Sequence, residues 1–246
     1  MTDIIFGKNP VTEALESGVE IEKIYMLNSM RGETEVMMRR ICKEKNIPLA
    51  KVPEIKLKEL SKNKVHQGLV AMISPVRYQD VQDIIAGAYE NGQIPLLLVA
   101  DGVTDVRNLG ALARSAYFFG AHALILSGGI GGRINDEAVK ASAGAMLKIP
   151  VCRNPSIFNL ISDFQSAGIK VIATGMKTEN SISESDLKEP VAILLGSEDK
   201  GLHPKVFEVV DEVVKIPAGG DFDSLNVSVA GGILMYEVNR QRHSKN

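Results

Sequence analysis

Hydrophobic residues follow two alternating patterns along most of the chain. Residues 96–100 are consecutive apolar residues, typical of a strand buried on both faces of a sheet. Other short apolar runs alternate with stretches whose apolar positions recur every three or four residues, as in a helix with one buried face. The runs predict further strands at 123–126, 149–152, 170–173, 191–195 and 212–216. The spaced stretches predict helices at 109–119, 136–146, 157–167, 204–209 and 225–240. Such alternation predicts an α/β fold with a mainly parallel sheet covered by helices.

The first 76 residues show the same alternation on a smaller scale. Asn9 and Pro10 suit the cap and the first position of a helix. The pattern predicts helices at 11–17, 33–45 and 55–61, and strands at 21–27, 48–52 and 68–74. We therefore expect a small α/β domain at 1–76, a linker at 77–94 with its own helix at 81–89, and a larger domain at 95–246.

Composition narrows the class of protein only slightly. The 246 residues are 45% hydrophobic, as in ordinary soluble globular proteins, and only 5% aromatic, so extensive base stacking is not expected. The net charge is −2, although residues 1–76 carry 12 basic and 10 acidic side chains. Cys42 and Cys152 are far apart and outside any metal-binding pattern, so no zinc site is expected. No signal peptide and no apolar stretch of about 20 residues is seen, which predicts a cytoplasmic protein without a membrane span.

The sequence lacks the usual motifs for binding nucleotide phosphates. The glycine-rich segment 127–132 follows a predicted strand but does not match the dinucleotide or P-loop patterns. An oxidoreductase that uses a nicotinamide cofactor is therefore disfavoured. The four histidines are scattered, and no arrangement for nucleophilic catalysis is visible.

Polar residues gather instead in three segments, each just after a predicted strand. In open α/β sheets, ligands bind at the carboxyl ends of the strands. Each segment also has a plain structural interpretation. Asn108 would cap the next helix, with Arg114 as a surface arginine. Glu198 would be a solvated side chain in a tight turn. Ser224 or Asn226 would cap the last helix, where the small residues Ser228 and Gly232 allow close packing. The polar side chains concerned are Asn108 and Arg114, Glu198, and Ser224 and Asn226.

The order and spacing of these segments resemble the SpoU/TrmH family of RNA 2′-O-ribose methyltransferases, in the SPOUT superfamily. The resemblance covers about residues 95–242. It rests on the motifs 108–114, 196–202, 216–217 and 224–228. Segments 6–15 and 66–71 are similar to the ribosomal-protein-like substrate-binding domain of the RlmB-like, rRNA-modifying group.

The resemblance implies a deep trefoil knot in the catalytic domain and a homodimer. It also implies S-adenosylmethionine as methyl donor and no metal. The expected reaction is methylation of a ribose 2′-hydroxyl in RNA, with guanosine in large-subunit rRNA favoured by the N-terminal similarity. A tRNA substrate is the alternative within this class. A non-catalytic RNA-binding ribosome assembly factor is the alternative outside it.

The resemblance also assigns roles to individual residues. Arg114 would position the hydroxyl and stabilise developing negative charge, since a guanidinium is too basic to act as a base. The other expected catalytic residues are Asn108, Glu198, Ser224 and Asn226. The residues expected to hold the donor are Thr174, Gly175, Met176, Leu195, Gly196, Ile216 and Leu225. Two residues depart from the family pattern: Asp199 stands where many members have Gly, and Val106 where Pro is common.

Overall fold

The computed structural model describes residues 4–128, 134–175, 178–220 and 224–244. The chain forms two compact units, which we call the N-terminal unit (residues 1–77 with 133–136) and the larger unit (78–132 and 137–246). None of the helices in the described part of the chain is long and apolar enough to span a membrane.

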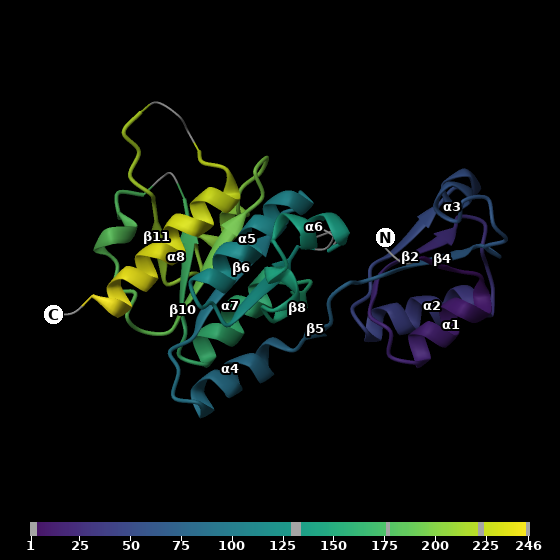
Figure 1. Ribbon diagram of the computed structural model, residues 1–246, viewed down its shortest axis with the longest axis horizontal. Helices are drawn as coiled ribbons and strands as arrows, with labels where there is room; N and C mark the ends of the chain where they lie inside the picture. Colours follow the sequence, from purple (N-terminus) through teal and green to yellow (C-terminus); the bar gives the residue numbers. More distant parts are fainter. Residues whose placement is uncertain (1–3, 129–133, 176–177, 221–223, 245–246) are drawn as a thin grey trace. The chain divides into compact units, whose positions relative to one another are not determined.

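The N-terminal unit is a four-stranded sheet with helices on both faces (Figure 1). The strand order is β1-β4-β2-β3, with β2 and β3 parallel and the other pairs antiparallel. Residues of β2 and β4 alternate between the faces: Ile24 and Met26 pack with α1 and α2, whereas Tyr25 packs with Leu57 of α3. The elements are β1 (Ile4–Phe6), α1 (Lys8–Glu16), β2 (Ile21–Leu27), α2 (Glu33–Glu44), β3 (Leu49–Val52), α3 (Glu54–Leu60) and β4 (Leu69–Ile73).

Two details of this unit differ from the sequence-based prediction. Strand β1 was not predicted, because three residues are too few for a periodic signal. The start of α1 was wrong: its N-cap is Gly7, and Asn9 and Pro10 lie within the helix. The side chain of Gln67 takes over the capping, since its Oε1 accepts a hydrogen bond from the Lys8 amide at 2.9 Å.

The larger unit is built on a seven-stranded sheet in which every paired strand is parallel. Its strand order is β11-β9-β10-β6-β7-β8-β5. The predicted α/β class with a mainly parallel sheet is confirmed. Residues 78–90 form β5 and α4, and β5 is the edge strand of this sheet. The strands are β5 (Tyr78–Gln79), β6 (Leu96–Asp101), β7 (Ala123–Ser127), β8 (Val151–Asn154), β9 (Lys170–Thr174), β10 (Val191–Gly196) and β11 (Glu212–Val214).

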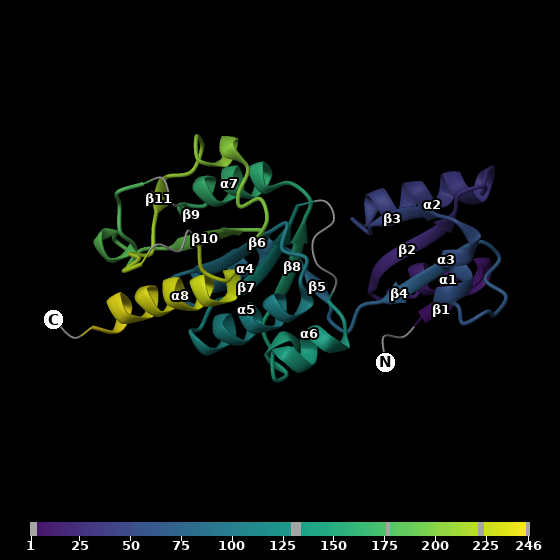
Figure 2. The same cartoon turned by 90° about the horizontal axis from the view of Figure 1, so that it is seen from above.

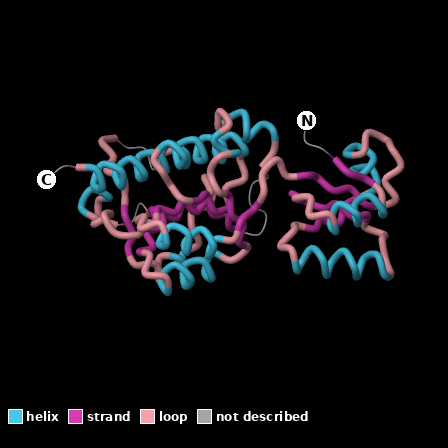
Figure 3. The backbone as a smooth tube through the Cα atoms, turned by 60° about the horizontal axis from the view of Figure 1, so that its bottom comes forward, coloured by secondary structure: helices cyan, strands magenta, loops and turns pink. Residues whose placement is uncertain are grey.

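Helices cover both faces of this sheet (Figures 2 and 3). On one face, α4 and α7 pack on alternate residues of the central strands, such as Leu97, Val99 and Leu194. On the other, α8 contacts α5 and β10. A Cβ at Gly231 of α8 would lie 2.5 Å from a methyl group of Leu112, so glycine allows this close approach. The helices are α4 (Val81–Glu90), α5 (Val106–Phe118), α6 (Asp136–Ala141), α7 (Ile157–Ser166) and α8 (Val227–His243), with short 3-10 turns η1 (Ala145–Leu147), η2 (Ile182–Glu184) and η3 (Pro204–Val206).

Two helix predictions in this unit were too long. The stretch 136–146 is broken after α6, where Ala143 and Gly144 have φ angles of 50° and 83°. The buried Ser142 hydroxyl donates to the Val139 carbonyl and accepts from the Met146 amide, which satisfies backbone groups at the break. The stretch 204–209 forms only the single turn η3.

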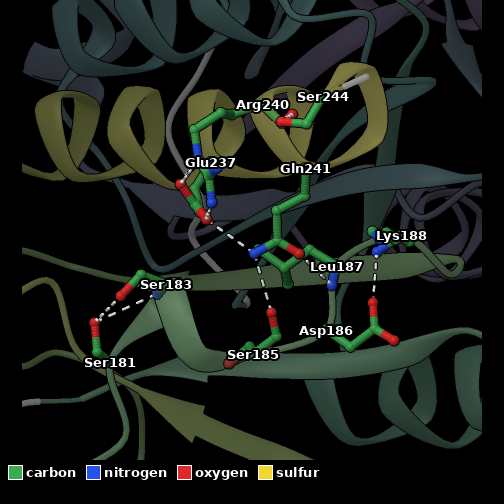
Figure 4. A network of polar contacts seen from close by, with 10 residues as sticks. All are labelled: Ser181, Ser183, Ser185, Asp186, Leu187, Lys188, Glu237, Arg240, Gln241 and Ser244. Carbon is green, nitrogen blue, oxygen red and sulfur yellow. Dashed lines mark hydrogen bonds and ion pairs between the residues drawn. The ribbon is translucent and has the colours of Figure 1, made fainter. Parts of the chain in front are cut away.

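The end of α8 is fastened to the segment before β10 by a polar network (Figure 4). Gln241 donates to the Ser185 carbonyl at 3.0 Å and accepts from the Leu187 amide at 3.1 Å. Arg242 donates to four backbone carbonyls, those of Ile94, Pro95, Leu187 and Glu189. These contacts fix the last turn of α8 against the backbone just before β6 and just before β10. The trefoil knot itself stays an expectation from the family resemblance.

Candidate active site

The parallel order of the sheet brings the three predicted segments to one edge. Gly196, the last residue of β10, lies directly opposite Asp101, the last residue of β6. Strand β9 lies next to β10, and β11 lies next to β9. Both run in the same direction as β10. The loops that follow these four strands therefore leave the sheet at neighbouring positions, and they carry most of the residues predicted to be functional.

Asp105, not Asn108, caps α5. Its carboxylate accepts from the Arg107 and Asn108 amides at 2.7 and 3.1 Å. The predicted capping role of Asn108 was therefore wrong: Asn108 lies in the first turn, and its side chain is available for other contacts. Val106, which replaces the family's common proline, is the first residue of the helix, a position that proline favours.

Asn108, Glu198 and Asn226 form a closed ring of hydrogen bonds. Asn108 Nδ2 donates to Glu198 Oε1 at 2.6 Å. Asn226 Nδ2 donates to the same oxygen at 2.8 Å and to Asn108 Oδ1 at 3.0 Å. One residue from each of the three segments takes part, although 28 to 118 positions separate them in the sequence.

Asn226 is also the N-cap of α8, one of the two caps predicted there. Its Oδ1 accepts from the Ser228 amide at 2.9 Å and from the Ser228 hydroxyl at 2.6 Å. These contacts direct the Asn226 amide nitrogen toward Glu198. The sequence-based interpretation of Ser228 as a small packing residue missed this role. A serine two residues after a capping asparagine is the signal that indicates it.

Arg114 stands apart from the ring. It lies on an exposed position of α5, and within the described part of the chain its guanidinium forms no hydrogen bond or ion pair. The side chains of Asn108 and Glu198 bond to each other and not to Arg114. The guanidinium is therefore available for a ligand. Ser224 is likewise exposed, two residues before the ring.

Two glycines of the motifs are required by close packing. A Cβ at Gly110 would lie 2.6 Å from the Ala138 carbonyl oxygen, so this glycine lets α5 pack against α6. A Cβ at Gly196 would collide with the backbone of Gly201 and Leu202, where the loop folds back on itself. In the same loop Gly201 has a left-handed backbone, with φ 62°, and Asp199 does not.

The residues expected to hold the methyl donor surround the ends of three adjacent strands. The Thr174 hydroxyl donates to the Leu194 carbonyl, and the Gly175 amide donates to the Val214 carbonyl. Leu195 is buried, Ile216 is half-buried, and the side chain of Leu225 is 49% exposed. Met176 lies outside the described residues. Backbone groups and an exposed apolar side chain suit the adenine ring of S-adenosylmethionine.

Asp101, at the end of β6, is a carboxyl group with a shifted pKa. Burial raises its pKa above the usual range, while the Ser127 hydroxyl and the charge of His203 act in the opposite direction. The Ser127 side chain is itself buried. Among the described residues, no three His, Cys, Asp or Glu side chains are grouped so that they could hold a metal ion.

Comparison with known proteins agrees with this geometry. Residues 95–236 match the SpoU rRNA Methylase family, and residues 4–79 match the family described as RNA 2′-O ribose methyltransferase substrate binding. A protein of Mycobacterium ulcerans (strain Agy99) named an uncharacterized tRNA/rRNA methyltransferase is 33% identical over 247 residues, covering 99% of this chain and 78% of its own.

Two solved structures show which parts of the chain are shared. The AdoMet-bound rRNA methyltransferase from Sinorhizobium meliloti has a TM-score of 0.60 and 26% identity, over 98% of this chain and 88% of its own. The A. aeolicus TrmH/SpoU tRNA modifying enzyme has a TM-score of 0.56 and 29% identity, over 61% of this chain and 76% of its own.

The fold and the site together define an RNA methyltransferase with a separate substrate-binding unit. The chain belongs to the SpoU rRNA Methylase family. The family predicted from the three motifs is thus confirmed.

Proposed function

We propose that this protein methylates a ribose 2′-hydroxyl of large-subunit rRNA, at a guanosine, with S-adenosylmethionine as donor. The observation that carries the proposal is the Asn108–Glu198–Asn226 ring, which joins all three family motifs beside the expected donor loops. Two findings favour rRNA over tRNA. The chain has the substrate-binding unit, and the rRNA enzyme resembles nearly all of it, whereas the tRNA enzyme resembles 61%. Such a reaction places the protein in the cytoplasm.

The reaction joins the ribose 2′-oxygen to a methyl carbon while the bond from that carbon to sulfur breaks. When bound, S-adenosylmethionine supplies a methyl group already activated by a sulfonium. The protein must place the hydroxyl in line and stabilise the charge that develops on its oxygen. We assign this stabilisation to Arg114, whose guanidinium has no ion-pair or hydrogen-bond partner among the described residues. The hydroxyl proton passes to water or to a substrate phosphate, since a guanidinium does not accept it.

The ring residues act by holding the site rather than by proton transfer. Both Asn108 and Asn226 donate to one oxygen of Glu198, so the loop after β10 is tied to the first turns of α5 and α8. This arrangement fixes where Arg114 and the donor loops lie relative to each other. Ser224, exposed next to the ring, is assigned a contact with the substrate.

The substrate is tested by transfer of radiolabelled methyl groups to protein-free large-subunit rRNA and, separately, to bulk tRNA. We expect label in rRNA, recovered as 2′-O-methylguanosine after digestion to nucleosides. Label confined to tRNA would keep the chemistry and contradict the rRNA assignment. Donor binding without label in either RNA would point to assembled ribosomal particles as the substrate. Absence of both label and donor binding would support the assembly-factor alternative.

We also propose that the protein is a homodimer joined through α5 and α8. These helices expose a cluster of aromatic and aliphatic side chains in the larger unit, and a groove between them is lined by Ser115, Phe119, Ile233 and Tyr236. Phe118 is 80% exposed. An apolar surface of this extent on a water-soluble domain marks an interaction site. Arg114 lies between Ala111 and Phe118 on α5, so a partner on this face would lie beside the site.

A charge placed on this face is expected to separate the subunits. Ile233→Glu would bury a carboxylate in the interface, whose desolvation costs several kcal/mol and leaves a monomer. Sedimentation velocity measures the change, and methyl transfer is expected to fall with it. Val36→Glu makes the same change at an exposed position of α2 and serves as control. A wild-type monomer, or an unchanged dimer in Ile233→Glu, contradicts the assignment.

A further inference from the structure

The N-terminal unit has few aromatic rings with which to hold RNA. Its only phenylalanine and tyrosine in residues 4–77 are Phe6 and Tyr25, and the half-buried ring of His66 accepts a hydrogen bond from the Gly68 amide. The Lys64 ammonium lies over the ring of Phe6, 5.6 Å from its centroid, and the Lys23 ammonium lies over Tyr25 at 5.2 Å. Tyr25 is also buried in the sheet. Stacking of unpaired bases on aromatic side chains, a common way to hold single-stranded RNA, is therefore not open to this unit.

The segment between α3 and β4, which we call the 61–67 loop, has an unusual backbone. Lys62, Asn63 and Gln67 have φ angles of 52°, 61° and 49°. These are left-handed conformations that side chains other than glycine rarely adopt, at a cost of roughly 1 kcal/mol or more for each residue. Such a conformation persists only where surrounding contacts hold it, and here they are present.

Hydrogen bonds hold the 61–67 loop at its start, in its middle and at its end. The Ser61 side chain is buried, and its hydroxyl lies within hydrogen-bond distance of the Lys58 and Lys64 carbonyls. The Asn63 amide donates to the Lys58 carbonyl at 2.8 Å. At the far end, Gln67 caps α1 through the Lys8 amide. The loop therefore presents its side chains from a fixed backbone, which lowers the entropy lost on binding.

The side chains that this loop presents are basic. Lys62 and Lys64 are exposed, and neither forms an ion pair within the described part of the chain. Lys56 and Lys58, on the preceding helix, are paired with Glu59 and Glu54. These pairs occupy both acidic side chains of that helix, and the loop contains no acid of its own. Two unpaired positive charges on a rigid support are thus left facing solvent.

We propose that the 61–67 loop is the RNA-binding element of the N-terminal unit, and that Lys62 and Lys64 bind phosphates of folded RNA. Val65, which follows Lys64 and is 82% exposed, would contact the sugar backbone. A rigid loop with two charges and no stacking surface selects a backbone of fixed shape, as in a helical or tightly turned RNA, over a flexible single strand. This inference rests on the proposed function, since it assumes an RNA substrate.

The test replaces both lysines with glutamine in the full-length protein and measures binding to protein-free large-subunit rRNA at a series of salt concentrations. Each lost phosphate contact is expected to lower the salt slope of log K by about 0.9, and the double variant to lose affinity roughly 10- to 30-fold at physiological salt. In methyl transfer, KM rises while kcat stays unchanged, because none of the residues assigned to catalysis belongs to the loop. Lys62→Gln/Lys64→Gln is compared with Arg40→Gln/Lys43→Gln, which removes two charges from exposed positions of α2.

The outcomes separate this proposal from the function on which it rests. Wild-type protein that methylates rRNA, with an unchanged slope and KM in the lysine variant, overturns the loop assignment alone. An equal loss in the α2 variant also overturns it, because any surface charge would then serve. Poly(U) is the single-stranded probe: an equal loss of poly(U) and rRNA affinity overturns the selection of folded RNA. Absence of methyl transfer by the wild type overturns the proposed function.

Discussion

Replacing Arg114 with alanine is expected to slow methyl transfer roughly 10²- to 10³-fold, the usual effect of losing one group that stabilises charge in a transition state. The affinity for S-adenosylmethionine is expected to stay the same, because Arg114 lies on α5 and the expected donor loops follow β9, β10 and β11. Single-turnover methylation gives the rate, and calorimetry with the donor alone gives the affinity. Arg114→Lys is expected to recover little, since an ammonium lacks the planar fork of a guanidinium.

Arg107→Ala is the matched control for this prediction. Arg107 lies in the first turn of the same helix and is 78% exposed, with an ion pair to Glu137 at 2.8 Å. Exposed pairs of this kind contribute at most about 1 kcal/mol, so the control is expected to keep its fold and most of its activity. Equal loss of rate in both variants, or loss of donor affinity in Arg114→Ala, would show that the helix and not the guanidinium is responsible.

Elements whose residues are determined by burial could be predicted from the sequence. Residues 96–100 were read as a strand buried on both faces, and β6 is such a strand because α4 and α7 cover one face and α5 and α8 the other. The parallel order followed from the alternation of strands and helices. Since the carboxyl ends of parallel strands all lie at the same end of the sheet, the meeting of the three polar segments was predictable as well.

The contacts inside the site could not be predicted in the same way. Asn108 was interpreted as a helix cap because the sequence presents several polar residues before α5, and the chain uses Asp105 instead. The partner of Asn108 is Glu198, 90 positions away, which only the finished sheet brings near. Local patterns report which residues are polar, whereas the pairing of polar groups depends on the path of the whole chain. A knot is a property of that path too, and no periodicity indicates one.

Helix ends depend on single contacts and were predicted least well. The break after α6 requires the buried Ser142 hydroxyl, and the start of α1 requires Gln67, which lies 59 positions from Lys8. The Gln67 contact forms only when the chain is folded, whereas Ser142 bonds to groups three and four residues away. By contrast, Asn226 was predicted as a possible cap of α8 because capping there is local to two residues.

Arg242→Ala is expected to lower the free energy of unfolding more than any other substitution named above. Burial lowers the pKa of this guanidinium from its usual value, yet the group stays charged because four carbonyls surround it. Alanine would remove these charged hydrogen bonds and leave the carbonyls of Ile94, Pro95, Leu187 and Glu189 without this donor. Hydrogen bonds to a charged group contribute about 1.5–3 kcal/mol each but are not additive, so a loss of roughly 3–5 kcal/mol in the free energy of unfolding is expected.

Urea unfolding of the full-length protein measures this loss, and Arg240→Ala is its control. Arg240 is two residues away and bonds only within α8 and the end of the chain, chiefly to Glu237, so its loss is expected to cost less than about 1 kcal/mol. Similar midpoints for both variants would contradict the role given to the four carbonyls. Because Asn226 caps the start of α8 and Arg242 lies in its last turn, loosening that turn also frees the helix that supports the ring. Methyl transfer by Arg242→Ala is therefore expected to fail at a lower temperature than transfer by Arg240→Ala.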